Sequence, residues 1–146
     1  MLLNDVKTLT EYYDCLKLCP KGRTFIKNAI EKRAREPQAT PYNKLFYYTS
    51  LKMGVVIVCE GEWEYQMALT LEYGDALAYL DQPPTQYVKS PNKNGTFFGR
   101  KTTADFTALY NGGVVVYEVK PKSKLEKLHK ENPEHIQKDE SGNYYN

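Results

Sequence analysis

Two carboxylates and a lysine near the open end of a predicted β-hairpin have the residue types and the spacing to hold a metal ion. The hairpin is predicted because Asn111-Gly112, a strong signal for a two-residue turn, separates two runs rich in β-branched and aromatic residues. With that turn, Asp105 lies directly opposite Glu118, and Lys120 shares the face of Glu118. Opposed carboxylates repel each other unless a cation lies between them, and Mg²⁺, with Mn²⁺ as a substitute, takes such oxygen ligands. A three-residue loop would instead turn Asp105 away from Glu118.

A third carboxylate is expected from a helix predicted over residues 60–74. Glu60 and Glu64 are one helical turn apart, and like charges at that spacing destabilise a helix by roughly 0.2–0.5 kcal/mol. Glu60 lies at the predicted helix start, where the helix dipole favours an acid. Glu64 has no such local reason for its charge, so we expect Glu64 to be the metal-proximal residue of this helix.

The elements that must position these residues follow from apolar periodicity and from turn signals. Glycine and proline separate most of the periodic segments, and Pro83-Pro84 imposes an extended crossing. The alternation of helical and β-branched segments predicts an α/β fold. We expect helices over residues 6–18, 24–34, 60–74 and 123–130, a loop over 37–43, and strands over 54–59, 85–89, 102–110 and 113–120.

The net charge of +2 conceals an uneven distribution of charged residues along the chain. Residues 17–35 contain seven basic residues and one acid, whereas residues 60–81 contain six acids and no base. A basic face beside an acidic stretch is expected where a polyanion approaches a carboxylate-held metal. The alternative is that both stretches are solvated helix faces.

The compartment is predicted from the cysteines and from the apolar segments. No stretch approaches the ~20 consecutive apolar residues of a membrane span, and the N-terminal residues show no export signal. Three cysteines, Cys15, Cys19 and Cys59, make a disulfide framework improbable, so we expect three buried thiols in a reducing cytoplasm. We therefore expect a cytoplasmic protein of a bacterium or a phage, without a membrane partner.

The order of these features resembles the D-(E/D)xK nuclease superfamily, in which a helix Glu, a strand Asp and a hydrophobic strand ending in Glu-x-Lys follow one another. At closer range, residues 48–122 resemble the TnsA-like endonuclease subunit of heteromeric cut-and-paste transposases. The chain departs from that family at Gly61, where the family has Ser, and at Ala104, where it has Pro. The matching motifs are Ser50-Leu51-Lys52-Met53-Gly54, Glu60-Gly61-Glu62-Trp63-Glu64, Glu72 to Asp75, Gln82-Pro83, Ala104-Asp105 and Glu118-Val119-Lys120-Pro121.

The resemblance implies a restriction-endonuclease-like mixed β-sheet flanked by helices and a Mg²⁺-dependent endodeoxyribonuclease activity. It implies that Asp105 and Glu118 hold Mg²⁺, that Glu64 completes the site or positions a second metal, and that Lys120 orients the nucleophilic water. The family cleaves the 5′ ends of a transposon in double-stranded DNA, together with a DDE transposase and an AAA+ ATPase regulator. Gln82 belongs to the Gln-Pro motif. We expect phosphate contacts from Lys52, Arg100, Lys101, Lys21, Arg23, Lys27 and Arg33.

A length of 146 residues suits one domain with at most a small appendage. We expect a basic helical N-terminal segment over 1–50 packed on the core, a catalytic core over 51–122, and a polar tail over 123–146 that is a truncated or partly disordered end. Two other functions stay open. One is a phage or DNA-repair nuclease of the same fold that acts alone, and the other is a non-catalytic DNA-binding assembly module.

Overall fold

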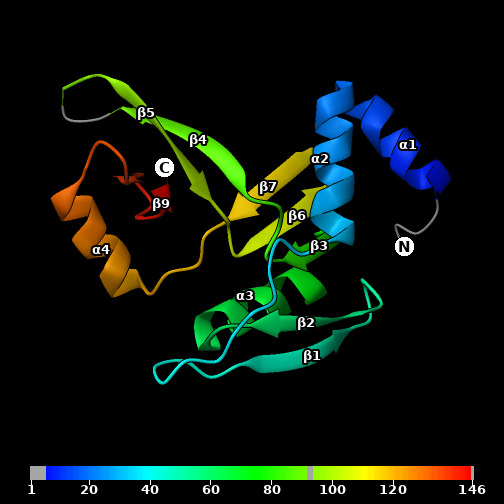
Figure 1. Ribbon diagram of the computed structural model, residues 1–146, viewed down its shortest axis with the longest axis horizontal. Coiled ribbons are helices and arrows are strands. Elements are labelled where there is room, and N and C mark those ends of the chain that lie inside the picture. The colour runs from blue at the N-terminus through cyan, green and yellow to red at the C-terminus, as the bar shows by residue number, and fades with distance from the viewer. Residues whose placement is uncertain (1–5, 92–93, 146) are drawn as a thin grey trace.

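The computed structural model describes residues 6–91 and 94–145, and it shows helices and antiparallel strands in an α/β arrangement (Figure 1). All strand pairs among the described residues are antiparallel, so the mixed sheet that we expected is not seen there. No helix in these two ranges has the length and apolarity needed to cross a membrane. The elements are α1 (Val6–Cys15), α2 (Pro20–Glu31), β1 (Phe46–Ser50), β2 (Val55–Cys59), α3 (Glu62–Tyr73), β3 (Ala78–Asp81), β4 (Gln86–Pro91), β5 (Phe97–Thr102), β6 (Phe106–Tyr110), β7 (Gly113–Tyr117), α4 (Lys122–Glu131), β8 (Gln137–Lys138) and β9 (Tyr144–Tyr145).

The central sheet has the strand order β3-β6-β7. Tyr110 pairs with Gly113, which confirms the two-residue turn at Asn111-Gly112. Strand β6 is the middle strand, paired with β3 and β7, and four of its five residues are buried. Phe106 and Ala108 belong to one apolar cluster and Leu109 to another. The last pair of the hairpin ladder joins Phe106 to Tyr117.

The main core lies where helix α3 and the β1–β2 pair pack near the central sheet. Ile57 of β2, Leu71 of α3, and Tyr79 and Phe106 of the sheet are each almost fully buried there. Burial of side chains of this size contributes about 1.5–3 kcal/mol each. This core fixes the N-terminal end of α3 relative to the open end of the β6–β7 hairpin.

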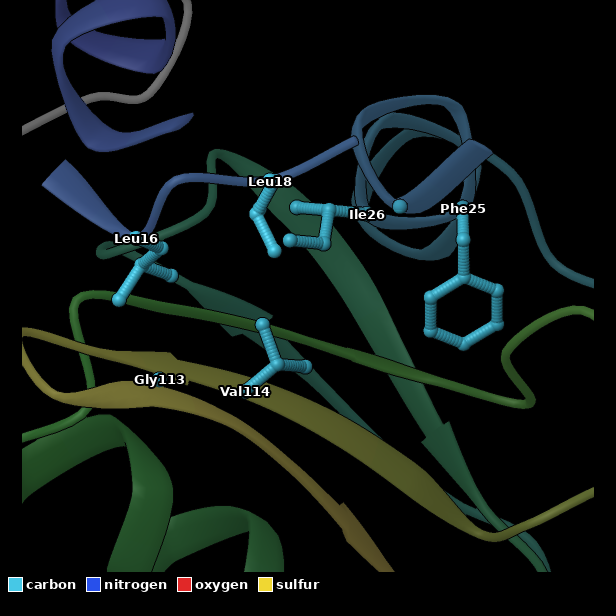
Figure 2. Close-up of a pocket in the computed structure, with 7 residues that line it drawn as sticks. Leu16, Leu18, Phe25, Ile26, Gly113 and Val114 are labelled. Carbon is cyan, nitrogen blue, oxygen red and sulfur yellow. The ribbon is translucent and has the colours of Figure 1, made fainter. Parts of the chain in front are cut away.

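Helices α1 and α2 cover the other end of the central sheet through a second apolar cluster. Tyr12, Ile26 and Leu109 belong to it, and the Tyr12 hydroxyl lies 2.7 Å from the Tyr110 carbonyl oxygen. An open, apolar cavity of about 350 Å³ lies between this helical segment and β7. Figure 2 shows Leu18 and Ile26 above Val114 at this cavity.

Strands β4 and β5 form a two-stranded ribbon that extends away from the central sheet (Figure 1). Among the described elements, each of these strands makes extensive contacts only with the other. The strand expected over 85–89 is therefore confirmed, with bounds Gln86–Pro91. The sequence Pro91-Asn92-Lys93-Asn94-Gly95 predicts a turn after β4, but residues 92–93 lie outside the described residues.

Several element bounds differ from those expected. The strand expected over 102–110 is β6, which begins four residues later, at Phe106, because Thr102 is the last residue of β5. Strand β7 ends at Tyr117, so Glu118 and Lys120 follow the strand instead of belonging to it. The predicted sequence pattern missed β1, β3 and β5. The helix over 123–130 is confirmed as α4, and the expected loop over 37–43 contains only an isolated bridge, Thr40–Asn43.

Two of the three thiols and the boundary expected at residue 50 lie within the described residues. Cys59 is a buried thiol, as expected, whereas Cys19 is exposed because it lies in the link that begins α2. The side chain of Cys15 lies outside the described residues. Strand β1, before the expected boundary at residue 50, pairs along its whole length with β2, after that boundary.

Candidate active site

Asp105 is held in the link between the β4–β5 ribbon and β6. Its backbone N–H donates to the Tyr117 carbonyl oxygen at 2.9 Å, and its carbonyl oxygen accepts from the Gln82 N–H at 2.9 Å. Its carboxylate oxygen Oδ2 accepts from the backbone N–H of Val119 at 2.6 Å. These three bonds fix both the backbone and the side chain of Asp105 across the open end of the hairpin.

The opposition of Asp105 and Glu118 expected from the turn does not extend as a regular ladder. A regular continuation beyond Phe106 and Tyr117 would pair Asp105 with Glu118. Instead, the ladder ends at that pair, the Asp105 N–H donates to the Tyr117 carbonyl oxygen, and the Asp105 carboxylate accepts from the Val119 N–H. The expected cross-strand pair of Asp105 with Glu118 is therefore not part of the ladder, although both residues lie at the same end of the hairpin.

Glu118 and Lys120 form an ion pair beside Asp105. The Lys120 ammonium donates to the Glu118 carboxylate, whose side chain is 51% exposed. Burial raises the pKa of Asp105, the Val119 N–H lowers it, the charge of Glu118 raises it and the charge of Lys120 lowers it. The net pKa of Asp105 lies above its ordinary value. Glu118 and Lys120 are therefore close enough to influence the ionisation of Asp105.

Glu64 has a local role that the sequence reasoning missed. Helix α3 begins at Glu62, two residues later than expected, so Glu64 stands in the first turn. Its carboxylate oxygen Oε2 accepts at 2.7 Å from the N–H of Glu60, the residue before the N-cap Gly61, and so holds the link that leads into α3. The expectation that Glu64 lacks a local reason for its charge is wrong.

The Glu64 carboxyl is also the most perturbed acid of this region. Burial raises its pKa, the Glu60 N–H lowers it, and the charges of Asp105 and Glu60 raise it further, to about 7. The element that carries Glu64 thus comes near Asp105, more than forty residues along the chain.

Arg35 is the residue near these acids that was not among the predicted site residues. Its guanidinium donates to both Glu60 carboxylate oxygens, at 2.5 and 2.7 Å, and the Gln38 N–H donates to Glu60 at 2.9 Å. These donors hold the pKa of Glu60 below its ordinary value, against a smaller effect of burial. Arg35 closes the basic run at 17–35, directly before a loop, which is the only signal in the sequence that marks it.

The donor chemistry of this cluster fits Mg²⁺, but the side chains do not converge as they stand. Asp105, Glu118 and Glu64 offer only carboxylate oxygens, and Mg²⁺ commonly takes one or two protein carboxylates plus water and phosphate. Each of the three accepts a local hydrogen bond, and within the described ranges no group of three His, Cys, Asp or Glu side chains is placed to hold one ion. The two more exposed carboxyl groups would have to rotate toward Asp105.

Lys52 lies at the other end of helix α3 from Glu64. Its ammonium donates to the carbonyl oxygens of Leu71 at 2.7 Å and Gly74 at 3.0 Å, so it caps the C-terminal end of the helix. Ten residues of α-helix separate Glu64 from Gly74, which corresponds to about 15 Å. The structure does not bring Lys52 together with the acids.

The predicted phosphate contacts of the N-terminal segment divide into paired and exposed side chains. Arg33 forms a bidentate pair with the buried Asp81, with Nε–Oδ2 at 2.6 Å and Nη2–Oδ1 at 2.9 Å. Arg23 pairs with Asp14 at 2.8 Å. Lys21 and Lys27 are exposed on α2 and remain accessible to a phosphate.

Two further predicted contacts lie on β5, and Gln82 lies beside Asp105. Lys101 is exposed, and Arg100 is on the strand with its side chain outside the described residues. Gln82 is buried with a positive φ of 49°, and its carbonyl oxygen accepts from the Ala34 N–H at 2.7 Å. Because its own N–H donates to the Asp105 carbonyl, Gln82 links the N-terminal segment to the backbone of Asp105.

Comparison with known proteins adds no relative to this description. No protein-family model matches the chain, and no curated protein matches it in sequence.

Proposed function

We propose that the protein is a Mg²⁺-dependent DNA endonuclease. The observation that carries the proposal is the position of the Asp105 carboxylate at the open end of the β6–β7 hairpin. Val119 fixes it from the backbone, the Glu118–Lys120 pair lies beside it, and Glu64 interacts with it electrostatically. Three acids and a lysine have the composition required for phosphodiester hydrolysis.

Each of these residues has a distinct part in the proposed reaction. Asp105 and Glu118 would hold Mg²⁺, and Glu64 would complete the site or position a second ion. Bound Mg²⁺ lowers the pKa of coordinated water and neutralises phosphate charge. Lys120 would leave Glu118, orient the attacking water and stabilise the negative charge that develops on the phosphate.

The finer assignment is a TnsA-like subunit with a restriction-endonuclease-like fold. It is supported by the chain order of helix α3 with Glu64, then Asp105, then the hydrophobic strand β7 followed by Glu118 and Lys120. On this proposal the protein cleaves the 5′ ends of a transposon, with a DDE transposase and an AAA+ ATPase as partners. Lys21 and Lys27, both exposed, would contribute phosphate contacts without sequence preference.

A second candidate is a non-catalytic DNA-binding module that keeps this arrangement of acids. The local partners of the acids favour it, because Glu64 accepts from the Glu60 N–H, Glu118 pairs with Lys120, and Asp105 accepts from the Val119 N–H. In this case the carboxylates contribute to folding and have no affinity for a metal.

Nicking of supercoiled plasmid DNA in Mg²⁺ tests the proposal. We expect Lys120→Ala to lose about 100-fold in rate, because one group that stabilises transition-state charge is removed. Lys122→Ala, which changes an exposed lysine two residues away, should retain activity. Efficient nicking by the protein alone favours the stand-alone nuclease, and nicking only with a transposase partner favours the transposon subunit. Equal rates for both variants contradict the assignment of Lys120.

A further inference from the structure

The β4–β5 ribbon presents one face on which aromatic and basic side chains alternate. Tyr87 pairs with Lys101, and Lys89 pairs with Gly99, so these four residues share a face, together with Phe97. Tyr87 is 66% exposed and Phe97 is 72% exposed. Lys89 and Lys101 are also exposed. The face therefore combines two large apolar rings with two cations, all open to solvent.

The Tyr87 ring packs at one defined position on this face, over Gly99. A Cβ atom added to Gly99 would collide with the ring and hydroxyl of Tyr87. The ring therefore lies across the backbone at Gly99, diagonally over the strand pair, where only glycine leaves room for it. Such a cross-strand aromatic cover stabilises a glycine in a strand, and it holds the ring flat. One side of the ring faces the ribbon and the rest is available to a partner.

The exposed aromatic rings of the ribbon do not pack against either apolar cluster of the described residues. Strands β4 and β5 make extensive contacts only with each other among the described elements, so Phe97 adds nothing to the main core. An exposed apolar patch rimmed by polar groups indicates an interaction surface. An isolated two-stranded hairpin is also marginally stable in water, so a partner that covers this face would stabilise it.

Charge identifies the chemistry of that partner. Residues 82–104 contain no acidic residue, and Lys89 and Lys101 flank the aromatic rings on the described face. A positively charged surface with exposed aromatic rings matches a single-stranded nucleic acid, whose phosphates pair with cations and whose bases stack on rings. Tyr87 and Phe97 stand four residue positions apart along the ribbon, about 13 Å, which places them under different nucleotides of one strand.

The base of the ribbon lies at the candidate active site. The hydroxyl groups of Thr85 and Thr103 are 2.8 Å apart, which joins the two chains of the ribbon just before Asp105. Gln82, which precedes the ribbon, bonds the backbone of Asp105. A DNA strand bound along the ribbon face would thus lead toward the carboxylates of the candidate active site.

We propose that the exposed face of the β4–β5 ribbon binds an unpaired stretch of DNA by stacking bases on Tyr87 and Phe97 and by pairing phosphates with Lys89 and Lys101. The inference deepens the proposed function, and it rests on that function for the role of the bound DNA as part of a nuclease substrate. The physical basis, aromatic rings beside cations, does not require hydrolysis. Binding measured in EDTA therefore separates failure of this inference from failure of the nuclease assignment.

The test is fluorescence anisotropy of a labelled oligothymidine of about 12 nucleotides with the full chain in EDTA. We expect Tyr87→Ala and Phe97→Ala each to weaken binding about tenfold, and Tyr87→Phe to bind as the unchanged protein does. Tyr73→Ala, which removes an 85% exposed tyrosine at the end of α3, is the matched control and should change nothing. Lys89→Gln should lower the slope of log affinity against log salt by about 0.7.

Three results would overturn the inference. The first is affinity for Phe97→Ala equal to that of Tyr73→Ala, which would show that the exposed ring is not used. Phe97 does not cover Gly99, so the Phe97→Ala substitution leaves the packing of Tyr87 over Gly99 unchanged. The second is an equal loss of affinity for a duplex of the same length in Tyr87→Ala and Phe97→Ala, which would assign the ribbon to a DNA groove. The third is a salt slope unchanged by Lys89→Gln.

Discussion

The carboxylate oxygen Oδ2 of Asp105 lies 2.6 Å from the backbone nitrogen of Val119, across the open end of the β6–β7 hairpin. This bond fixes a carboxylate at the point where strand β7 has ended and the Glu118–Lys120 pair begins. It makes Asp105 both a structural residue and the proposed centre of a metal site.

The first prediction separates these two roles through stability. Asp105→Ala leaves the Val119 N–H without its acceptor, so we expect a loss of about 1–3 kcal/mol in the free energy of unfolding. Asp105→Asn keeps an acceptor oxygen and should cost less. Urea unfolding of the two variants measures the difference, and equal stability of both variants would show that the bond contributes nothing.

The second prediction compares two arginine ion pairs of the N-terminal segment, one buried and one exposed. Asp81 is 1% exposed, so Arg33→Ala leaves a buried carboxylate without its cation and should cost about 3–5 kcal/mol. Arg23→Ala breaks an exposed pair with Asp14 and should cost about 1 kcal/mol or less. Thermal or urea unfolding measures both. A similarly small loss of unfolding free energy in the two variants would show that Arg33 is not held by Asp81 and is available to contact DNA.

The third prediction concerns the polar cluster around Glu72. Burial raises the pKa of Glu72, but hydrogen bonds from Ser50, Tyr79 and the backbone N–H groups of residues 51 and 52 outweigh it, and the net pKa lies below the ordinary 4.5. A lowered folded-state pKa gives stability that is present above pH 4.5 and is lost as the pH falls through the folded value.

We therefore expect Glu72→Gln to destabilise the protein by about 1–3 kcal/mol at pH 7. The gap to the unchanged protein should narrow below pH 4.5, where the carboxyl becomes protonated. Urea unfolding at several pH values measures the gap. A gap that stays constant with pH would show that the charge of Glu72 is not what these donors stabilise.

The fourth prediction uses the raised pKa of Glu64. Its folded value of about 7 exceeds the ordinary 4.5, so the folded state holds the proton more tightly than the unfolded chain does. The stabilising effect of that proton is complete below pH 4.5 and is lost as the pH rises through 7. In EDTA, Glu64→Gln should lack this part of the pH dependence of unfolding. If both proteins lose stability equally between pH 4.5 and 7, Glu64 is not the titrating group.

The turn and the order of the acids were predictable because their signals are local. Asn111-Gly112 sets the pairing of Tyr110 with Gly113 through turn geometry alone, and the structure agrees. The end of the ladder was not predictable in this way. Beyond Phe106 and Tyr117, Asp105 is also bonded by the Gln82 N–H, a contact between residues distant in sequence that no local pattern marks.

Other errors have similar physical causes. Helix α3 was expected to begin at Glu60, which hid the bond from the Glu60 N–H to the Glu64 carboxylate, although Gly61 before the first turn was a sequence signal for a later start. The pairing of Arg33 with Asp81 spans 48 positions, and no local pattern marks it. Strand β3 has only four residues, too few for a period to stand out from its neighbours.

Calorimetric titration of the full chain with Mn²⁺ tests the central claim most directly, namely that Asp105, Glu118 and Glu64 form one divalent-cation site. The proposed site predicts binding that Asp105→Asn and Glu64→Gln each weaken by about tenfold or more, because each removes a charged ligand. Glu62→Gln, an exposed acid in the same helical turn as Glu64, should bind as the unchanged protein does. Equal Mn²⁺ affinity in all three variants and the unchanged protein would contradict the metal site and favour the non-catalytic module.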